Sequence, residues 1–316
     1  MNHNSAAMIK KILQFPKTVS IMEVGPRDGL QNEKVILGTN DKISFINSLS
    51  QAGYKRIEIT AFVSPKWIPP LADHNDVARG ITKYPNISYA ALVPNLFGYE
   101  KARDAGIDEV SIVLSASQTH NKKNINATTQ EAFERYKEVV KTAIKDKIPI
   151  RAYLSCSFAC PYEGAMDPQV VALLCLKLYE LGVYEVSLSD TIGVASPFNI
   201  LRLLEETLKY VPIKSLGLHL HDTFGMALAN ILAGLQVGIT SFDSSAGGMG
   251  GCPYAKGALG NVASEDLLYM LHSMGIETGV SLSKVCDASL QIEKKLQKML
   301  SAKVLNNYRV GLKSEK

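Results

Sequence analysis

The sequence is poor in cysteine and lacks any long apolar segment. Its 316 residues include 5 cysteines, an odd number that argues against a secreted disulfide framework and favours reduced thiols in a cytosol. No apolar run reaches the ~18–20 residues that a membrane-spanning helix needs. Lys10 and Lys11 precede no apolar stretch of the kind that signal peptides carry. We therefore expect a cytoplasmic protein with no membrane partner.

Long runs of one charge sign are also missing. The net charge is +4, and charged residues make up 20% of the chain without a basic block. Binding to nucleic acid that is driven by charge needs such a block, so we expect no nucleic-acid partner. An anionic small substrate remains compatible with this composition. No linker or low-complexity run divides residues 1–316, which predicts a single domain.

Short apolar runs rich in Val, Ile and Tyr alternate with helical patterns along most of the chain. The predicted strands are 19–24, 56–62, 88–93, 109–115, 149–155, 185–189, 215–221 and 240–245. The predicted helices between them include 40–52, 129–146, 167–181, 197–210, 226–237 and, as the last, 264–274. Parallel strands need crossover helices, so this alternation predicts a parallel sheet.

Eight strand–helix units in about 250 residues indicate a (β/α)8 barrel, here over about residues 18–275. A doubly wound open sheet is the less favoured alternative. Beyond the barrel, the pattern predicts one further helix over Ser283–Leu305 and a polar tail over 306–316. The additional helix covers the barrel or packs on a partner subunit, and the sequence does not choose between these.

Two histidines, His219 and His221, end the seventh predicted strand. Side chains at positions i and i+2 of a strand point to the same face. Neutral imidazole is a good ligand for divalent transition metals and a less common one for Mg²⁺. We interpret the pair as half of a metal site, with two buried histidines satisfied by hydrogen bonds as the alternative.

Polar residues gather where the predicted strands end, which is where barrels of this kind carry their active sites. Asp28 follows the first strand; it is either a turn residue or a third metal ligand across the barrel mouth from the histidines. Arg27 is either a surface charge or a fixed cation for a developing enolate oxygen. Glu58 lies inside an apolar strand. Because glutamate is seldom buried unpaired, we predict that Glu58 pairs with a cation, for which Arg27 is a candidate.

A glycine-rich loop, 247–252, follows the eighth predicted strand. It is not a dinucleotide-binding fingerprint, because Pro253 replaces the last glycine of that motif. Glycines let a backbone approach a ligand closely, which makes Cys252 a thiol that can reach a substrate. The alternative is a flexible coil with a buried, inert cysteine.

Several of these segments resemble the motifs of the hydroxymethylglutaryl-CoA lyase family, metal-dependent lyases built on a TIM barrel. The resemblance covers about residues 18–300 and keeps the order of the family's motifs. The matching segments are Gly25-Pro26-Arg27-Asp28-Gly29-Leu30-Gln31-Asn32-Glu33, Phe62-Val63-Ser64-Pro65-Lys66-Trp67, Leu188-Ser189-Asp190-Thr191-Ile192-Gly193, His219-Leu220-His221-Asp222-Thr223, Gly250-Gly251-Cys252-Pro253-Tyr254-Ala255 and Gly260-Asn261. Residues 245–249 depart from the family's usual loop, which bears on acyl-group preference more than on the chemistry.

The resemblance implies roles for ten residues. The implied ligands of a divalent metal ion, Mg²⁺ or Mn²⁺, are Asp28, His219, His221 and Asn261. The implied catalytic residues are Arg27, Glu58, Cys252, Asp28 and His219. The implied substrate-binding residues are Arg27, Gln31, Asp190 and Glu265. Among these, Arg27 would polarise the thioester carbonyl, Cys252 would be the loop thiol needed for turnover, and Glu265 would be a supporting acid.

The reaction implied by the resemblance is cleavage of 3-hydroxy-3-methylglutaryl-CoA to acetyl-CoA and acetoacetate, as in leucine degradation and ketone body formation. We expect an acyl-CoA substrate and a homo-oligomer, in the simplest case a dimer. The alternatives are a lyase for another 3-hydroxy-3-alkylglutaryl-CoA and a condensing relative such as isopropylmalate or citramalate synthase. A non-catalytic barrel would not need Arg27, Asp28, Glu58 and both histidines together.

Overall fold

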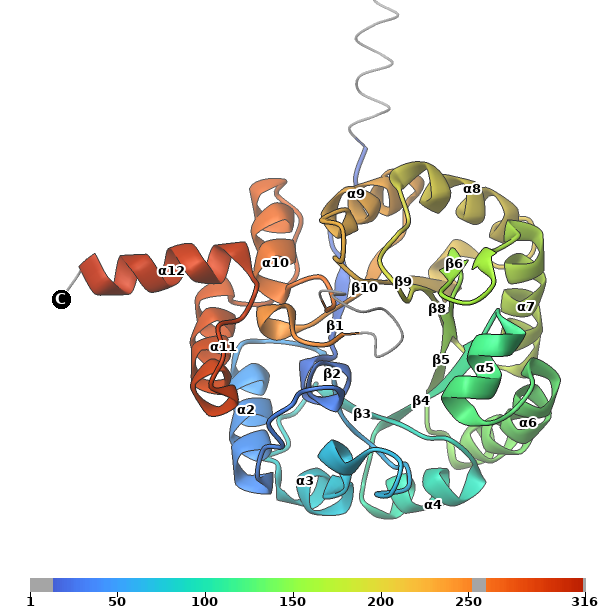
Figure 1. Ribbon diagram of the computed structural model, residues 1–316, viewed down its shortest axis with the longest axis horizontal. Helices are drawn as coiled ribbons and strands as arrows, with labels where there is room; N and C mark the ends of the chain where they lie inside the picture. The colour runs from blue at the N-terminus through green and yellow to red at the C-terminus, as the bar shows by residue number, and fades with distance from the viewer. Residues whose placement is uncertain (1–13, 252–259, 315–316) are drawn as a thin grey trace, which may run out of the picture.

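Eight parallel strands close into a barrel at the centre of the molecule (Figure 1). The computed structural model describes residues 14–251 and 260–314. The strands are β1 Ser20–Glu23, β2 Arg56–Ala61, β3 Ser88–Leu92, β4 Glu109–Ser115, β5 Ile150–Ser155, β8 Glu185–Asp190, β9 Leu216–Leu220 and β10 Ser241–Ser244. They follow one another in chain order, and β1 pairs with both β2 and β10. This closure confirms the predicted barrel and excludes the open sheet.

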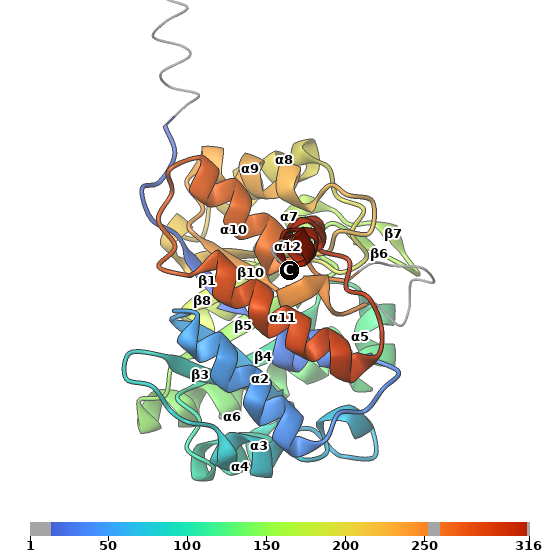
Figure 2. The same cartoon turned by 90° about the vertical axis from the view of Figure 1, so that its left-hand side faces the viewer.

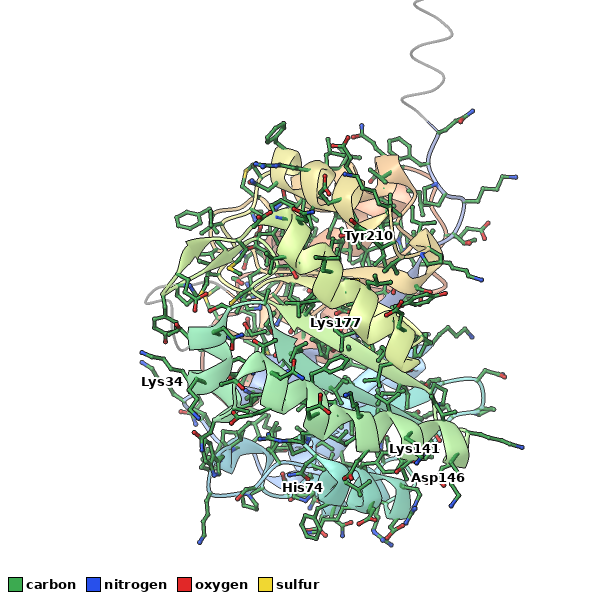
Figure 3. All side chains as sticks on the ribbon, turned by 90° about the vertical axis from the view of Figure 1, so that its right-hand side faces the viewer. Lys34, His74, Lys141, Asp146, Lys177 and Tyr210 are labelled. Atoms are coloured by element: carbon green, nitrogen blue, oxygen red, sulfur yellow. The ribbon has the colours of Figure 1, made fainter. Side chains whose placement is uncertain are left out.

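Helices surround the barrel, and the helices predicted up to residue 274 are all present with small shifts at their ends. They are α2 Thr39–Gln51, α3 His74–Gly80, α4 Leu96–Asp104, α5 Gln118–Ile125, α6 Thr129–Asp146, α7 Pro168–Leu181, α8 Pro197–Thr207, α9 Ala227–Val237 and α10 Ser264–Ser273. Figure 3 shows this layer from outside, with Lys141 of α6 and Lys177 of α7 on its exposed face. No helix in the described ranges is long and apolar enough to cross a membrane. A short hairpin, β6 Ala159–Cys160 and β7 Gly164–Ala165, follows β5.

Local sequence signals explain where α7 begins and ends. Asp167 caps its N-terminus by accepting a hydrogen bond from the amide of Gln169 (2.9 Å), and Pro168 occupies the first turn, where no amide partner is needed. The helix ends at Gly182, whose φ of 109° is a left-handed conformation that favours glycine. These signals end α7 shortly before β8 begins at Glu185.

The two faces of the barrel sheet bury different kinds of side chain. Along β2, Ile57 and Ile59 belong to the apolar core between the sheet and the helices. Glu58, between them, points into the barrel, where it meets the hydroxyl of Tyr153 on the non-adjacent strand β5. Because strand side chains alternate between faces, a polar interior coexists with an apolar exterior layer.

The C-terminal segment differs from the prediction. In place of one helix over Ser283–Leu305 there are two, α11 Leu282–Leu296 and α12 Lys303–Ser314, so the expected polar tail is largely helical. The chain turns at Gln297, which has a φ of 54°. Neither glycine nor proline marks this turn in the sequence, which is why the helical pattern appeared continuous.

Tertiary contacts cause this break between α11 and α12. Leu300 is buried, and the amide of Ser301 donates to the carbonyl of Gly247 in the loop after β10 (3.1 Å). The first amides of α12 donate to the carboxylate of Asp266 on α10. Figure 2 shows α11 alongside α2, while α12 projects from the body at the left of Figure 1.

Replacing Asp266 with alanine should loosen α12 without unfolding the barrel. The change leaves the amides of Lys303 and Val304 without their acceptor, and loss of a comparable helix cap costs about 1 kcal/mol. Hydrogen exchange followed by mass spectrometry should show faster exchange in α12, with α6 unchanged as the internal control. Unchanged exchange in α12 would contradict the capping role of Asp266.

Candidate active site

The turn after β1 directs Arg27 into the mouth of the barrel. It is a single π-helical turn, Gly25–Gly29, in which the amides of Arg27 and Asp28 both donate to the carbonyl of Val24. Such turns are frequent at functional sites. A Cβ at Gly25 would lie 2.6 Å from a buried carboxylate oxygen, so the turn needs glycine there. Arg27 is buried as a result, and Asp28 is half-buried beside it.

Arg27 and Glu58 form a buried ion pair, which confirms the predicted pairing. Nε of Arg27 lies 2.5 Å from Oε2 of Glu58, and Nη1 lies 2.5 Å from Oδ1 of Asp28. Glu58 also accepts hydrogen bonds from the hydroxyls of Tyr153 (3.0 Å) and Ser111. Burial disfavours the charged guanidinium, but Glu58 and Asp28 together raise the pKa of Arg27 above its ordinary value. Arg27 is therefore a permanent cation, fixed from two sides.

One carboxylate and two histidines converge next to this ion pair. Asp28, His219 and His221 each offer a ligand atom, and these atoms lie within 4.8 Å of one another. Nε2 of His219 is 3.9 Å from Oδ2 of Asp28. Asn261 lies opposite His221 in a backbone bridge, and its Nδ2 donates to Oδ2 of Asp28 (2.7 Å). All four residues predicted as metal ligands thus come together.

The electrostatics of this cluster suit a divalent cation. Burial, with a contribution from His219, lowers the pKa of His221 to about 4, so its imidazole is neutral. Its buried Nδ1 has no hydrogen-bond partner in the described part of the chain, which is costly unless another atom binds there. For Asp28, burial would raise the pKa, but Arg27 and the two histidines hold it well below its usual range. An ionised carboxylate beside imidazole nitrogens is a donor set typical of catalytic metal ions.

The cluster of Asp28, His219 and His221 lines a pocket of about 680 Å³ together with Arg27. Gln31, predicted to bind substrate, lies in the wall of the same pocket. Trp67 and Pro94 contribute apolar surface, while Lys123 and Arg135 contribute positive charge. A pocket with a few convergent polar groups and partly apolar walls is the usual form of a small-molecule site.

Two other predicted site residues, Asp190 and Glu265, are described by the structure but do not line this pocket. The carboxylate of Asp190 accepts hydrogen bonds from the amides of Val194 (3.1 Å) and Ala195 (2.9 Å), and burial raises its pKa to about 6. The carboxylate of Glu265 accepts from the amide of Gly247, at 2.8 Å from Oε2. Both acids organise loops that follow strands. The predicted loop thiol, Cys252, lies outside the described residues.

Sequence reasoning missed three residues that surround the cluster. Tyr153 lies under the guanidinium of Arg27, with the ring centroid 5.1 Å from Cζ. Asp243 accepts a hydrogen bond from His219, and Arg151 pairs with Asp243. Burial would raise the pKa of Asp243, but Arg151 lowers it to about 2. A charged residue inside an apolar strand was the signal that identified Glu58, and the same signal was available for Arg151.

The closed barrel and the cluster at the carboxyl ends of its strands define the class of protein, a (β/α)8-barrel enzyme with a candidate metal site. Comparison with known proteins gives the family. A sequence profile described as HMGL-like matches residues 18–292, and the chain belongs to that family.

Three similar proteins support the same conclusion. The human protein named 3-hydroxy-3-methylglutaryl-CoA lyase, cytoplasmic, is 52% identical over 290 residues, which cover 92% of this chain and 78% of the relative. The crystal structure of the Bacillus subtilis HMG-CoA lyase has a TM-score of 0.92 and 50% identity, covering 93% of this chain and 99% of that chain. An Acinetobacter baumannii HMG-CoA lyase, in complex with coenzyme A and 3-methylmalate, has a TM-score of 0.88 and 38% identity, covering 92% and 95% of the two chains. The predicted enzyme class is thereby confirmed: the chain is a lyase.

Replacing Glu265 with glutamine should change how stability depends on pH. Burial raises the pKa of Glu265 from 4.5 to about 7, so the folded protein keeps a proton that the unfolded chain releases in this window. The stability from this group is fully present below about pH 4.5 and is lost as the pH rises through about 7. As the pH rises between these limits, the free energy of unfolding of the variant should therefore increase relative to that of the wild type by on the order of 1–3 kcal/mol.

Denaturant unfolding at both ends of that pH window measures this difference. The exposed Glu180 on α7 provides the matched control, since Glu180→Gln should follow the wild-type curve at both pH values. If the free energy of unfolding changed equally with pH in the wild type and in Glu265→Gln, the raised pKa of Glu265 would be contradicted.

Proposed function

We propose that this protein cleaves 3-hydroxy-3-methylglutaryl-CoA to acetyl-CoA and acetoacetate with the help of a bound divalent cation. The observation that carries the proposal is the position of Arg27 between Glu58 and the Asp28–histidine cluster. The reaction needs a fixed positive charge beside the cation site, because negative charge develops there in the transition state. The name of the human relative at 52% identity supports this substrate.

The proposed metal site consists of Asp28, His219 and His221, with Asn261 as a further ligand. The ion we propose is Mg²⁺ or Mn²⁺. When bound, such a cation acts as a Lewis acid that makes the tertiary hydroxyl of the substrate easier to deprotonate. Nδ1 of His221 has no hydrogen-bond partner among residues 14–251 and 260–314, and this supports a ligand role for the side chain, because a cation would satisfy the buried imidazole.

Arg27 would stabilise the charge that appears as the carbon–carbon bond breaks. Once the hydroxyl has lost its proton, its carbon becomes the ketone carbon of acetoacetate. The electron pair of the broken bond moves into the thioester, which becomes the enolate of acetyl-CoA. The guanidinium is already held by Glu58 and Tyr153, so it needs no reorganisation to meet this charge.

A proton must finally return to the methylene carbon of the enolate. Cys252 or a histidine is the proposed donor, and the role of Cys252 rests on the family motif alone. Asp190 and Glu265 would act indirectly, since their carboxylates hold the backbone amides of loops beside the pocket.

The pocket suits an acyl-CoA substrate. Lys123 and Arg135 bring positive charge that matches the phosphates of coenzyme A, and Trp67 brings apolar surface. The Acinetobacter baumannii relative was solved with coenzyme A. Another 3-hydroxy-3-alkylglutaryl-CoA is the alternative substrate, which an activity screen with several such thioesters would distinguish. The predicted cytoplasmic location agrees with the name of the human relative, and the dimer stays a prediction.

Removal of divalent metal should abolish activity. Dialysis against EDTA should inactivate the protein, and Mg²⁺ or Mn²⁺ should restore turnover in a coupled assay for acetoacetate. His219→Ala should weaken Mn²⁺ binding by about 10²-fold or more, since it removes a ligand rather than a residue that supports one. His272 on the exposed face of α10 is the matched control, and His272→Ala should bind Mn²⁺ as the wild type does. Full activity of metal-free protein would refute the site.

Replacing Arg27 with glutamine should lower kcat by about 10²–10³-fold, which is typical for loss of one group that stabilises transition-state charge. The substrate KM should change much less, because the charge is needed mainly in the transition state. Arg103→Gln, on the outer surface of α4, is the matched control and should keep the wild-type kcat. Steady-state kinetics with 3-hydroxy-3-methylglutaryl-CoA measures kcat and KM of each variant. An unchanged kcat in Arg27→Gln would exclude the proposed role.

A further inference from the structure

The carboxylate of Asp243, which the proposed chemistry does not use, is hydrogen-bonded to the imidazole of His219. Asp243 on β10 is the register partner of His219, and its Oδ2 lies 3.2 Å from Nδ1 of that histidine. An ionised carboxylate only accepts hydrogen bonds, so Nδ1 must carry the proton. The lone pair is then left on Nε2, the nitrogen that faces Asp28.

Asp243 is itself fixed by two donors. Nη2 of Arg151 lies 3.0 and 3.3 Å from its two carboxylate oxygens, and the hydroxyl of Ser187 donates to Oδ2 (3.1 Å). Arg151 belongs to β5 and is fully buried. Since β5 and β10 are not neighbours in the sheet, this contact crosses the interior of the barrel and sets the direction in which the carboxylate points.

The same network continues away from the candidate metal site. Nη2 of Arg151 lies 2.9 Å from Glu185, which pairs with Arg56, and Arg56 pairs with Glu109 at 2.8 Å. Breaking a buried ion pair is destabilising at either end of such a chain. His219 contacts the network directly, through Asp243. Asp28 is connected to Arg151 more remotely, through Arg27, Glu58 and Tyr153. The Asp243 end and the Glu109 end of the network should therefore behave differently when mutated.

The two histidines of the cluster are therefore held differently. Nδ1 of His219 has a carboxylate partner, whereas Nδ1 of His221 is buried without a hydrogen-bond partner in the described ranges. A ring with one nitrogen hydrogen-bonded has its orientation and its tautomer set in advance. Asp243 presets His219 in this way, whereas the described residues offer no hydrogen bond to Nδ1 of His221.

We propose that Asp243 is a positioning residue of the metal site, which fixes His219 with Nε2 toward Asp28, and that Arg151 fixes Asp243 in turn. The inference rests on the proposed function, because it takes Asp28, His219 and His221 as ligands of a divalent cation. Removal of a residue that orients a metal-binding histidine typically lowers metal affinity by about 10–100-fold.

Calorimetric titration of the full-length chain with Mn²⁺ tests the proposal. Asp243→Asn should weaken Mn²⁺ binding by about 10–100-fold. Glu109→Gln is the matched control: it breaks the same network at its far end, so it should lower stability to denaturant and leave Mn²⁺ affinity unchanged. Wild-type affinity in Asp243→Asn would overturn the positioning role alone. A wild-type chain that binds no Mn²⁺ would overturn the metal site, and the positioning role with it.

A second measurement needs no variant of Asp243. Nitrogen-15 NMR of the imidazole groups in the Mg²⁺-loaded wild type reports which ring nitrogen carries the proton, with His219→Gln used to assign the signals. The expected result is a protonated Nδ1 on His219. A proton on Nε2 would overturn the proposal, even if Asp243→Asn failed to fold.

Discussion

The ion pair between Arg27 and Glu58 is the interaction on which the rest of the site depends. Removing one partner of a buried ion pair is destabilising, because it leaves the other charge without its main compensation. The pair holds Arg27 against Asp28, whose carboxylate also meets Asn261 and faces His219. Arg27, Asp28 and Glu58 are thus fixed by neighbouring side chains rather than by solvent, which is the preorganisation that electrostatic catalysis requires.

The alternation of side chains along each strand places the apolar residues that stabilise the fold on one face of the sheet and the polar residues of the candidate site on the other. Residues such as Ile57, Ile59 and Leu218 face the helices and form the apolar core. The residues between them, among them Glu58 and His219, face the interior and meet other polar groups there. The interior can therefore carry charge because the apolar layer outside it provides the favourable free energy of burial.

Buried acids connect the loops around the pocket. Glu23 accepts hydrogen bonds from the amides of Gly25 and Ala246, which belong to the loops after the first and the last strand of the barrel. Glu265 holds Gly247 in the same way. Because a carboxylate that accepts backbone amides needs no contact with substrate, these acids shape the site without lining it.

Much of this arrangement follows from the sequence alone, because its signals are local. The alternation of strand and helix patterns determined the barrel, the two-residue spacing of His219 and His221 determined their common face, and the apolar surroundings of Glu58 determined that it needs a cation. Only the tertiary structure decided that Asp243 meets Arg151, 92 residues away, and that the first turn of α12 is held by Asp266 of α10. The physical reason is that a buried polar group bonds to whichever partner the folded chain brings within about 3 Å, and that partner comes from strands and loops remote in sequence.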